Sequence, residues 1–186
     1  LYLNVFTPSR SGRAPVMVFI HGGALRAGSS SDYDASALAR EGGVVVVTLN
    51  YRLGALGFYA NAALGEDNAS ANYGVLDQIA ALEWVKRNIR RFGGDPRKVT
   101  VFGESAGART IQALLASPMA RGLFHRAILQ SISADNTITR AAAEERGADI
   151  ARRVGCAPQD VACLRAAPVE RLLEAQAAGP STVGTA

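Results

Sequence analysis

Histidine is the scarcest reactive residue in this chain of 186 residues, which contains only His21 and His125. Cysteine is equally rare, with only Cys156 and Cys163. A structural zinc site takes four nitrogen, sulfur or carboxylate ligands that lie close together, and no histidine lies near the two cysteines. The sequence therefore predicts no metal site, and no motif in it calls for a cofactor.

Lysine and long hydrophobic runs are scarce as well. Of the 20 basic residues only Lys86 and Lys98 are lysines, and the arginines are scattered through a chain of net charge +4. A nucleic-acid-binding surface concentrates its basic residues on one face, so no nucleic-acid partner is expected. No apolar run approaches the roughly 20 residues of a membrane-spanning helix, so no membrane partner is expected either.

The hydrophobic residues that are present, 48% of the chain, alternate between strand-like and helix-like segments. Continuous apolar runs, typical of buried parallel strands, predict strands at 1–6, 16–20, 44–49 and 127–130 and another from 99. Helical spacing predicts helices at 32–40, 73–91, 106–115, 139–154, 160–166 and 169–177, and 50–72 is predicted to be a long loop. This alternation indicates an α/β fold, a mostly parallel sheet with flanking helices. Its functional site is expected at the carboxyl ends of the strands.

The segment Gly103-Glu104-Ser105-Ala106-Gly107 joins a predicted strand to a predicted helix. Gly-x-Ser-x-Gly in this context is typical of a nucleophile elbow, a sharp strained turn that exposes a serine hydroxyl. The two glycines are expected because such a turn leaves no room for a Cβ beside the serine. Ser105 is therefore the predicted nucleophile.

A second glycine-rich segment, His21-Gly22-Gly23-Ala24, follows the predicted strand 16–20. Acyl transfer needs N–H groups aimed at the oxygen that becomes negatively charged, and a glycine-rich loop can supply them. Where a nucleophile elbow is present, the N–H of the following residue, here Ala106, is a further donor. The alternative is a plain tight turn. His21 is interpreted as a residue that orients the loop backbone, not as a catalytic group.

A catalytic serine needs a base, and elbow hydrolases supply it in the chain order serine, acid, histidine. No Asp or Glu lies between Ser105 and His125, and no histidine follows His125. His125 precedes a predicted strand and is interpreted as structural. Residues 1–186 are therefore expected to form an incomplete domain that lacks the acid and the histidine. The start at Leu1 without methionine agrees with this expectation.

Cys156 and Cys163 are separated by six residues. One interpretation is a local disulfide that closes a short helix–loop–helix connection, which would indicate an oxidising compartment. The other is a pair of buried free thiols.

Together these segments resemble the type-B carboxylesterases, the cholinesterase-like branch of the α/β-hydrolases. The resemblance runs from residue 1 to about residue 173, and its other matching stretches are 1–5, 50–58, 72–78, 92–96 and 123–131. It implies a partial α/β-hydrolase fold and a serine esterase that forms an acyl-enzyme on Ser105. The implied partner is a small-molecule carboxylic ester, and the oligomeric state is not indicated.

The resemblance also implies roles for individual residues. Gly23, Ala24 and Ala106 match the donors of the oxyanion hole. Glu104 matches a buried acid that tunes the site, with a structural hydrogen-bonding role as an equal alternative. Ser133 matches, weakly, a serine that supports the site.

The resemblance bears on the cysteines too, because Cys156 and Cys163 match a disulfide that many family members have. It thereby implies a secreted or periplasmic protein.

Three positions depart from the family pattern. Ala24 replaces a usual glycine and adds a methyl group that could trim the acyl pocket, Ala108-Arg109 replaces small residues after the elbow, and Ile132 replaces a common glycine. None of them removes a reacting group. What they affect is the expected substrate preference and activity level.

Two other interpretations compete with the esterase. One is a catalytically inactive binding or adhesion protein of the same fold, which the retained Ser105 disfavours. The other is a truncated gene product that does not fold stably. The isolated segment is expected to have no appreciable turnover, because an oxyanion hole without a base leaves only weak catalysis.

Overall fold

The computed structural model describes residues 1–64, 71–132 and 137–178, and the chain divides into two compact units. The sheet unit comprises Leu1–Tyr51 and Val75–Ala134. The helical unit comprises Arg52–Gly74 and Asp135–Ala186. All the residues predicted to act on a substrate lie in the sheet unit.

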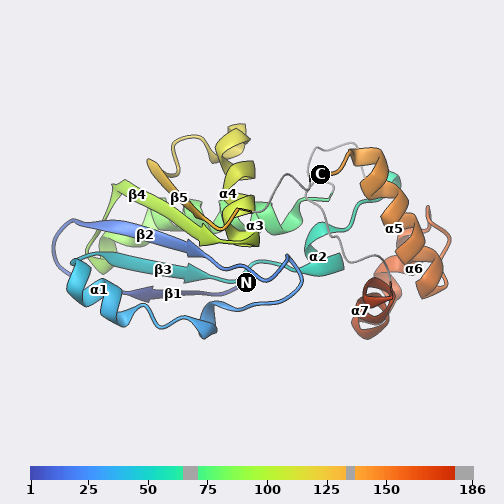
Figure 1. Cartoon of the computed structure of the whole chain (residues 1–186), viewed down its shortest axis with the longest axis horizontal. Helices are drawn as coiled ribbons and strands as arrows, with labels where there is room; N and C mark the ends of the chain where they lie inside the picture. Colours follow the sequence, from blue (N-terminus) through green and yellow to red (C-terminus); the bar gives the residue numbers. More distant parts are fainter. Residues whose placement is uncertain (65–70, 133–136, 179–186) are drawn as a thin grey trace. The chain divides into compact units, whose positions relative to one another are not determined.

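The sheet unit contains five strands in the order β1-β3-β2-β4-β5 (Figure 1). β1 pairs with β3 in antiparallel orientation, and the other three pairs are parallel. This confirms the predicted mostly parallel sheet. The strands are β1 (Leu3–Phe6), β2 (Ala14–Ile20), β3 (Val45–Leu49), β4 (Gly94–Glu104) and β5 (Arg126–Gln130).

The centre of the sheet is its core. All five residues of β3 are buried, as the continuous β-branched run predicted. Helix α3 (Tyr73–Asn88) buries Val75, Ile79, Leu82 and Val85, which recur at helical spacing on one face. Each such side chain contributes about 1.5–3 kcal/mol when it is fully buried. Helix α4 (Ala106–Ala116) packs against β4 and β5.

Strand register places the two glycine-rich segments side by side. Ile20, the last residue of β2, pairs with Gly103 of β4 on one side and with Leu49 of β3 on the other. The segments that follow β2 and β4 therefore leave the sheet at the same edge. This is the carboxyl edge, where the sequence predicted the site.

The helix predicted at 32–40 is partly wrong. The structure has α1 at Ser36–Gly42, preceded by a separate 3-10 turn at Ser30–Asp32. The acidic residues precede the helix instead of filling its first turn: the Asp34 carboxylate accepts a hydrogen bond from the Ser36 N–H at 2.9 Å. Hydrogen bonds from the Ser36 side chain and from its N–H hold the pKa of Asp34 below its ordinary value. A short polar side chain at such a position competes with the helix for backbone N–H groups.

The predicted loop at 50–72 is also partly wrong, because it contains helix α2 (Gly54–Phe58) and a 3-10 turn at Ala62–Leu64. Only five residues form α2, too few for a hydrophobic period to reveal it. Helix 73–91 ends earlier than predicted, at Asn88, and continues as a 3-10 turn, Ile89–Phe92.

The remaining helices of the helical unit lie where they were predicted, within a residue at each end. They are α5 (Arg140–Val154), α6 (Val161–Ala166) and α7 (Val169–Ala177). Their shared core consists of small or medium side chains: Ala151, Val154, Cys156, Leu164 and Ala175. Among the described residues, none of the helices has the length and apolar character needed to cross a membrane.

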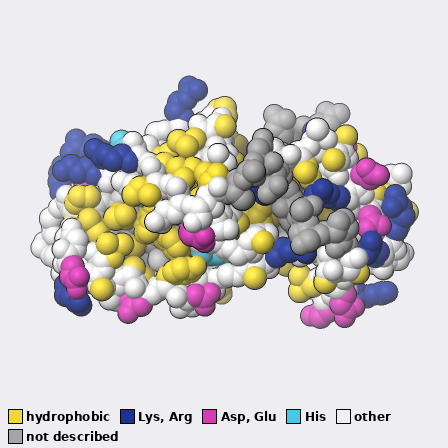
Figure 2. All heavy atoms as spheres, viewed as in Figure 1, with side chains coloured by type: hydrophobic (Ala, Val, Ile, Leu, Met, Phe, Trp, Pro, Cys, Tyr) yellow, Lys and Arg dark blue, Asp and Glu magenta, His cyan; other side chains and the backbone are white. Residues whose placement is uncertain are grey.

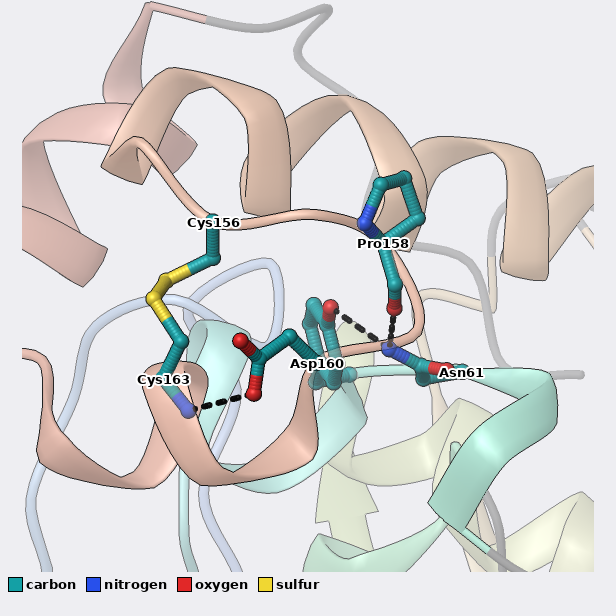
Figure 3. Close-up of a disulfide and its surroundings, with 6 residues drawn as sticks. Asn61, Cys156, Pro158, Asp160 and Cys163 are labelled. Carbon is teal, nitrogen blue, oxygen red and sulfur yellow. Dashed lines mark hydrogen bonds between the residues drawn. A yellow bond between two sulfur atoms is a disulfide. The ribbon is translucent and has the colours of Figure 1, made fainter.

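A disulfide closes the connection between α5 and α6 (Figure 3). It joins Cys156 to Cys163, whose Cα atoms lie 5.8 Å apart. The disulfide interpretation is thereby confirmed and the free-thiol alternative is wrong. Asp160 begins α6, because its carboxylate accepts a hydrogen bond from the Cys163 N–H at 2.9 Å. The Asn61 amide holds the same connection through the Pro158 carbonyl oxygen at 2.7 Å.

Hydrophobic side chains gather over the sheet unit on the face drawn in Figure 2. The exposed large hydrophobic residues of this unit include Met119, Leu115 and Ile128. Ile128 belongs to β5, which is the last strand in the sheet order and pairs only with β4 among the described residues.

Candidate active site

Ser105 lies at the turn between β4 and α4 and has a φ of 54° and a ψ of −120°. This backbone conformation is rare and strained for a residue with a side chain, and it persists only where the surroundings enforce it. The Ser105 N–H donates to the carbonyl oxygen of Gln130 at 2.9 Å, which ties the turn to the end of β5. The strained elbow predicted from the sequence is confirmed.

The two glycines of the elbow are required by close backbone approaches. A Cβ at Gly107 would overlap the carbonyl oxygen of Ile20, and it would lie 2.8 Å from the carbonyl oxygen of His21. A Cβ at Gly103 would lie 2.8 Å from the Ile20 oxygen and 2.8 Å from the carbonyl carbon of Gly107. Glycine is therefore required at both positions because the elbow and the start of α4 lie directly against the end of β2.

The glycine-rich loop after β2 lies beside the elbow. A Cβ at Gly22 would lie 3.3 Å from the Cβ of Ser105 and 2.8 Å from the carbonyl oxygen of Glu104. The loop backbone thus approaches the predicted nucleophile as closely as a residue without a side chain allows. This is where donors to a developing oxyanion have to lie.

Hydrogen bonds to two carbonyl groups set the direction of the predicted donors. The Gly22 carbonyl oxygen lies 2.8 Å from Nδ1 of His21. The Gly23 carbonyl oxygen accepts hydrogen bonds from the N–H groups of Arg26 and Ala27, both at 3.0 Å. In a trans peptide the C=O of one residue and the N–H of the next point in opposite directions. Fixing these carbonyl groups therefore fixes the N–H groups of Gly23 and Ala24.

Ala24 and Ala106 carry the other two predicted donors. Ala24 has a φ of 55°, in the left-handed region that favours glycine, which gives a physical reason for the glycine that the family pattern has at this position. Ala106 is the first residue of α4, so its N–H has no acceptor within the helix. The roles of Gly23, Ala24 and Ala106 as donors stay predictions.

His21 has the structural role that the sequence predicted. Its side chain is buried, and its ring stacks on the Tyr51 ring with centroids 4.5 Å apart. Because a carbonyl oxygen only accepts hydrogen bonds, the bond to Gly22 requires the proton on Nδ1 of His21. Through this bond His21 orients the backbone of the loop.

Tyr51 is the functional candidate that sequence reasoning missed. It follows β3, is buried, and donates a hydrogen bond from its hydroxyl to the His21 carbonyl oxygen at 2.8 Å. Burial raises the pKa of this hydroxyl well above its ordinary value. The signals in the sequence were its place two residues after a predicted strand, at the edge where the site was expected, and its place in the matching stretch 50–58.

His125 lies far from Ser105 along the sheet. Its N–H donates to the Val99 carbonyl oxygen at 2.8 Å, and the Val99 N–H donates to its Nδ1 at 3.3 Å. A strand rises by about 3.3 Å per residue, so Val99 and Glu104, which precedes the serine, are roughly 16 Å apart along β4. The structural interpretation of His125 is confirmed, and this histidine is not the base.

Glu104 is the last residue of β4, and its side chain leaves the sheet beside Gly22: Oε2 would lie 3.0 Å from a Cβ at that glycine. The residue is exposed in the described structure. The buried acid that the resemblance implied, and its role in tuning the site, stay predictions.

The positions that depart from the family pattern do not block the elbow. Ala108 is fully buried, Arg109 is half-buried, and Ile132 is exposed. Ser133 lies outside the described residues.

A cavity of about 370 Å³ in the helical unit is not the predicted site, because none of the predicted site residues lines it. Its lining residues include Leu56, Tyr59, Leu164 and Leu172.

Comparisons with known proteins show which family the chain resembles. The sequence pattern of the Carboxylesterase family matches residues 1–185. The chain is 46% identical to carboxylesterase 5A of Felis catus over 185 residues, covering 94% of this chain and 33% of that protein. It is 51% identical to the para-nitrobenzyl esterase of Bacillus subtilis over 178 residues, covering 94% of this chain and 36% of that protein.

A solved structure has a similar fold. The crystal structure of the Geobacillus stearothermophilus carboxylesterase EST55 matches with a TM-score of 0.92 at 44% identity, covering 98% of this chain and 41% of that one. The fold is therefore part of the α/β-hydrolase fold of such esterases. The chain spans about a third of the length of the curated relatives it matches.

Proposed function

Because this chain belongs to the carboxylesterase family, we propose that it is the nucleophile-bearing part of a serine esterase for small-molecule carboxylic esters. The observation that carries the proposal is the contact between the strained elbow and the glycine-rich loop, in which Gly22 adjoins Ser105. This contact supports the proposal, because acyl transfer needs a nucleophile and oriented N–H groups close together.

The proposed reaction has two steps. The Ser105 Oγ attacks the ester carbonyl carbon as its proton passes to a base, and the carbonyl oxygen becomes an oxyanion held by the N–H groups of Gly23, Ala24 and Ala106. When the intermediate collapses, the C–O bond to the alcohol breaks and the alcohol leaves with the proton. Water then attacks the acyl-serine and releases the acid. The base is a histidine oriented by an acid, both from outside residues 1–186.

An inactive binding protein is a weaker candidate, because it needs none of this geometry. Strain at Ser105 costs stability, and the two elbow glycines exist only to let that strained turn form. We also propose a secreted or periplasmic location, which the Cys156–Cys163 disulfide supports. The methyl group of Ala24 is proposed to narrow the space for the acyl group.

The test is labelling of the complete protein with a fluorophosphonate, followed by peptide mass spectrometry. We expect a single modified residue, Ser105, and no labelling of the variant Ser105→Ala. Thermal unfolding of both proteins serves as the control for folding. A folded wild-type protein that resists the probe would show that the elbow does not bear an active nucleophile and would refute the proposed esterase.

A further inference from the structure

We propose that Tyr51 is a positioning residue for the oxyanion hole and acts through His21. The inference rests on the proposed function and names a residue outside the predicted catalytic set. It starts from the strand register: Leu49 of β3 pairs with Ile20 of β2. His21 is the first residue after β2, and Tyr51 is the second residue after β3, so the two leave the same edge of the sheet from neighbouring strands.

Tyr51 holds His21 at two points. Its hydroxyl donates to the His21 carbonyl oxygen at 2.8 Å, and its ring stacks on the imidazole with an interplanar angle of 22°. The hydroxyl is buried, and a buried hydroxyl is tolerated only with a hydrogen-bond partner. Burial also raises the pKa of Tyr51, so its hydroxyl stays a neutral donor at alkaline pH as well.

His21 passes this constraint to the predicted donors through two consecutive peptide groups. Its carbonyl group, held by Tyr51, shares a peptide plane with the Gly22 N–H. The Gly22 carbonyl group, held by Nδ1 of His21, shares a plane with the Gly23 N–H. The orientation of the Gly23 N–H therefore depends on the position of the imidazole ring, and that position depends on Tyr51.

Two glycines show how little freedom the ring and its carbonyl group have. A Cβ at Gly28, where φ is 107°, would lie 2.6 Å from Nδ1 of His21 and 2.7 Å from the Gly22 carbonyl oxygen. On the other side, a Cβ at Gly107 would lie 2.8 Å from the His21 carbonyl oxygen. Backbone thus lies close to the His21 ring and to its carbonyl oxygen, and Tyr51 contacts both the ring and that oxygen.

The experiment compares variants of the complete protein. Tyr51→Phe keeps the stacked ring and removes the hydroxyl, and Tyr51→Leu removes both. The matched control is Tyr59→Phe, which removes a hydroxyl that donates to the Gly147 carbonyl oxygen at 3.1 Å in the helical unit. The measurements are kcat and KM with a nitrophenyl ester and the Ki of a trifluoromethyl ketone, which adds to the serine and places an oxyanion in the hole.

We expect Tyr51→Phe to lower kcat about 10-fold and to weaken the ketone by a similar factor, with KM changed less than about 2-fold. This is smaller than the roughly 10²–10³-fold loss on removal of an oxyanion donor itself. Tyr51→Leu should lower kcat further and weaken the ketone further. Tyr59→Phe should match the wild type in both measurements.

The outcomes separate this inference from the proposed function. If the wild type hydrolyses the ester and Tyr51→Phe behaves like Tyr59→Phe, the inference is overturned. The proposed esterase function is then unaffected. A rise in KM with unchanged kcat also overturns it, because it would indicate a substrate contact. A folded wild type without activity or probe labelling refutes the proposed function, and the inference with it. Thermal unfolding shows whether a variant has lost only stability.

Discussion

Four residues other than glycine adopt a positive φ in the described part of the sheet unit: Ala24, Leu25, Ser105 and Ser131. The described part of the helical unit has one, Ala71. The disulfide shows the opposite preference, because Cys156 and Cys163 both lie in the helical unit. The sheet unit therefore contains most of the strain, and the helical unit contains the cross-link.

This difference follows from what each unit can bury. The sheet unit has a core of Val, Ile and Leu side chains that are fully buried on β2, β3 and α3, and close packing of this kind can hold a strained turn in place. The core clusters of the helical unit consist largely of alanine and contain one buried leucine, Leu164. A small core of this kind contributes little hydrophobic stabilisation, and a disulfide compensates for it.

The largest expected effect comes from a methyl group at the elbow. Gly107→Ala places a Cβ against the Ile20 carbonyl oxygen, so α4 has to shift away from the end of β2, the central strand of the sheet. We expect destabilisation of more than about 4 kcal/mol and loss of fluorophosphonate labelling, measured by urea unfolding and mass spectrometry. The matched control is Gly155→Ala in the helical unit, at a φ of 91° with open space around the new Cβ.

For that control only the backbone conformation is unfavourable, so we expect a loss of about 1–2 kcal/mol and normal labelling. Equal effects of the two substitutions would contradict the view that packing, not φ alone, constrains the elbow.

The next effect concerns the disulfide. Replacing Cys156 and Cys163 with serine opens a short loop, for which chain entropy predicts a loss of about 2–3 kcal/mol. We expect the loss to affect the helical unit, seen as faster amide hydrogen exchange in α5 and α6. Labelling of Ser105 should change less than about 2-fold, because none of the predicted site residues lies in that unit. Protection lost equally from β2 and β3 would show instead that the two units unfold together.

The same contrast explains what the sequence could predict. The strands, α4 and the elbow were predictable because continuous apolar runs and the two glycines report local requirements of the backbone. The positions of α1 and α2 were not predictable in the same way. Asp34 binds the Ser36 N–H just before α1 begins, and α2 has only five residues, too few to show a hydrophobic period. Tyr51 was missed because its role depends on the neighbouring strand, and nothing in the residues around it indicates that β3 lies beside β2.

The smallest expected effect is a pH dependence in the sheet unit. The Asp95 carboxylate accepts a hydrogen bond from the Arg97 N–H at 3.0 Å, and this bond holds the pKa of Asp95 below its ordinary value. A carboxyl group whose pKa is lower in the folded state stabilises the protein above its unfolded-state pKa of about 3.9, and that contribution is lost as pH falls through the folded-state value. We therefore expect the wild type to lose stability more steeply below about pH 4 than Asp95→Asn. Urea unfolding from pH 7 to pH 3 measures the difference, and parallel curves for the two proteins would show that this carboxylate contributes nothing to the acid sensitivity of the strained unit.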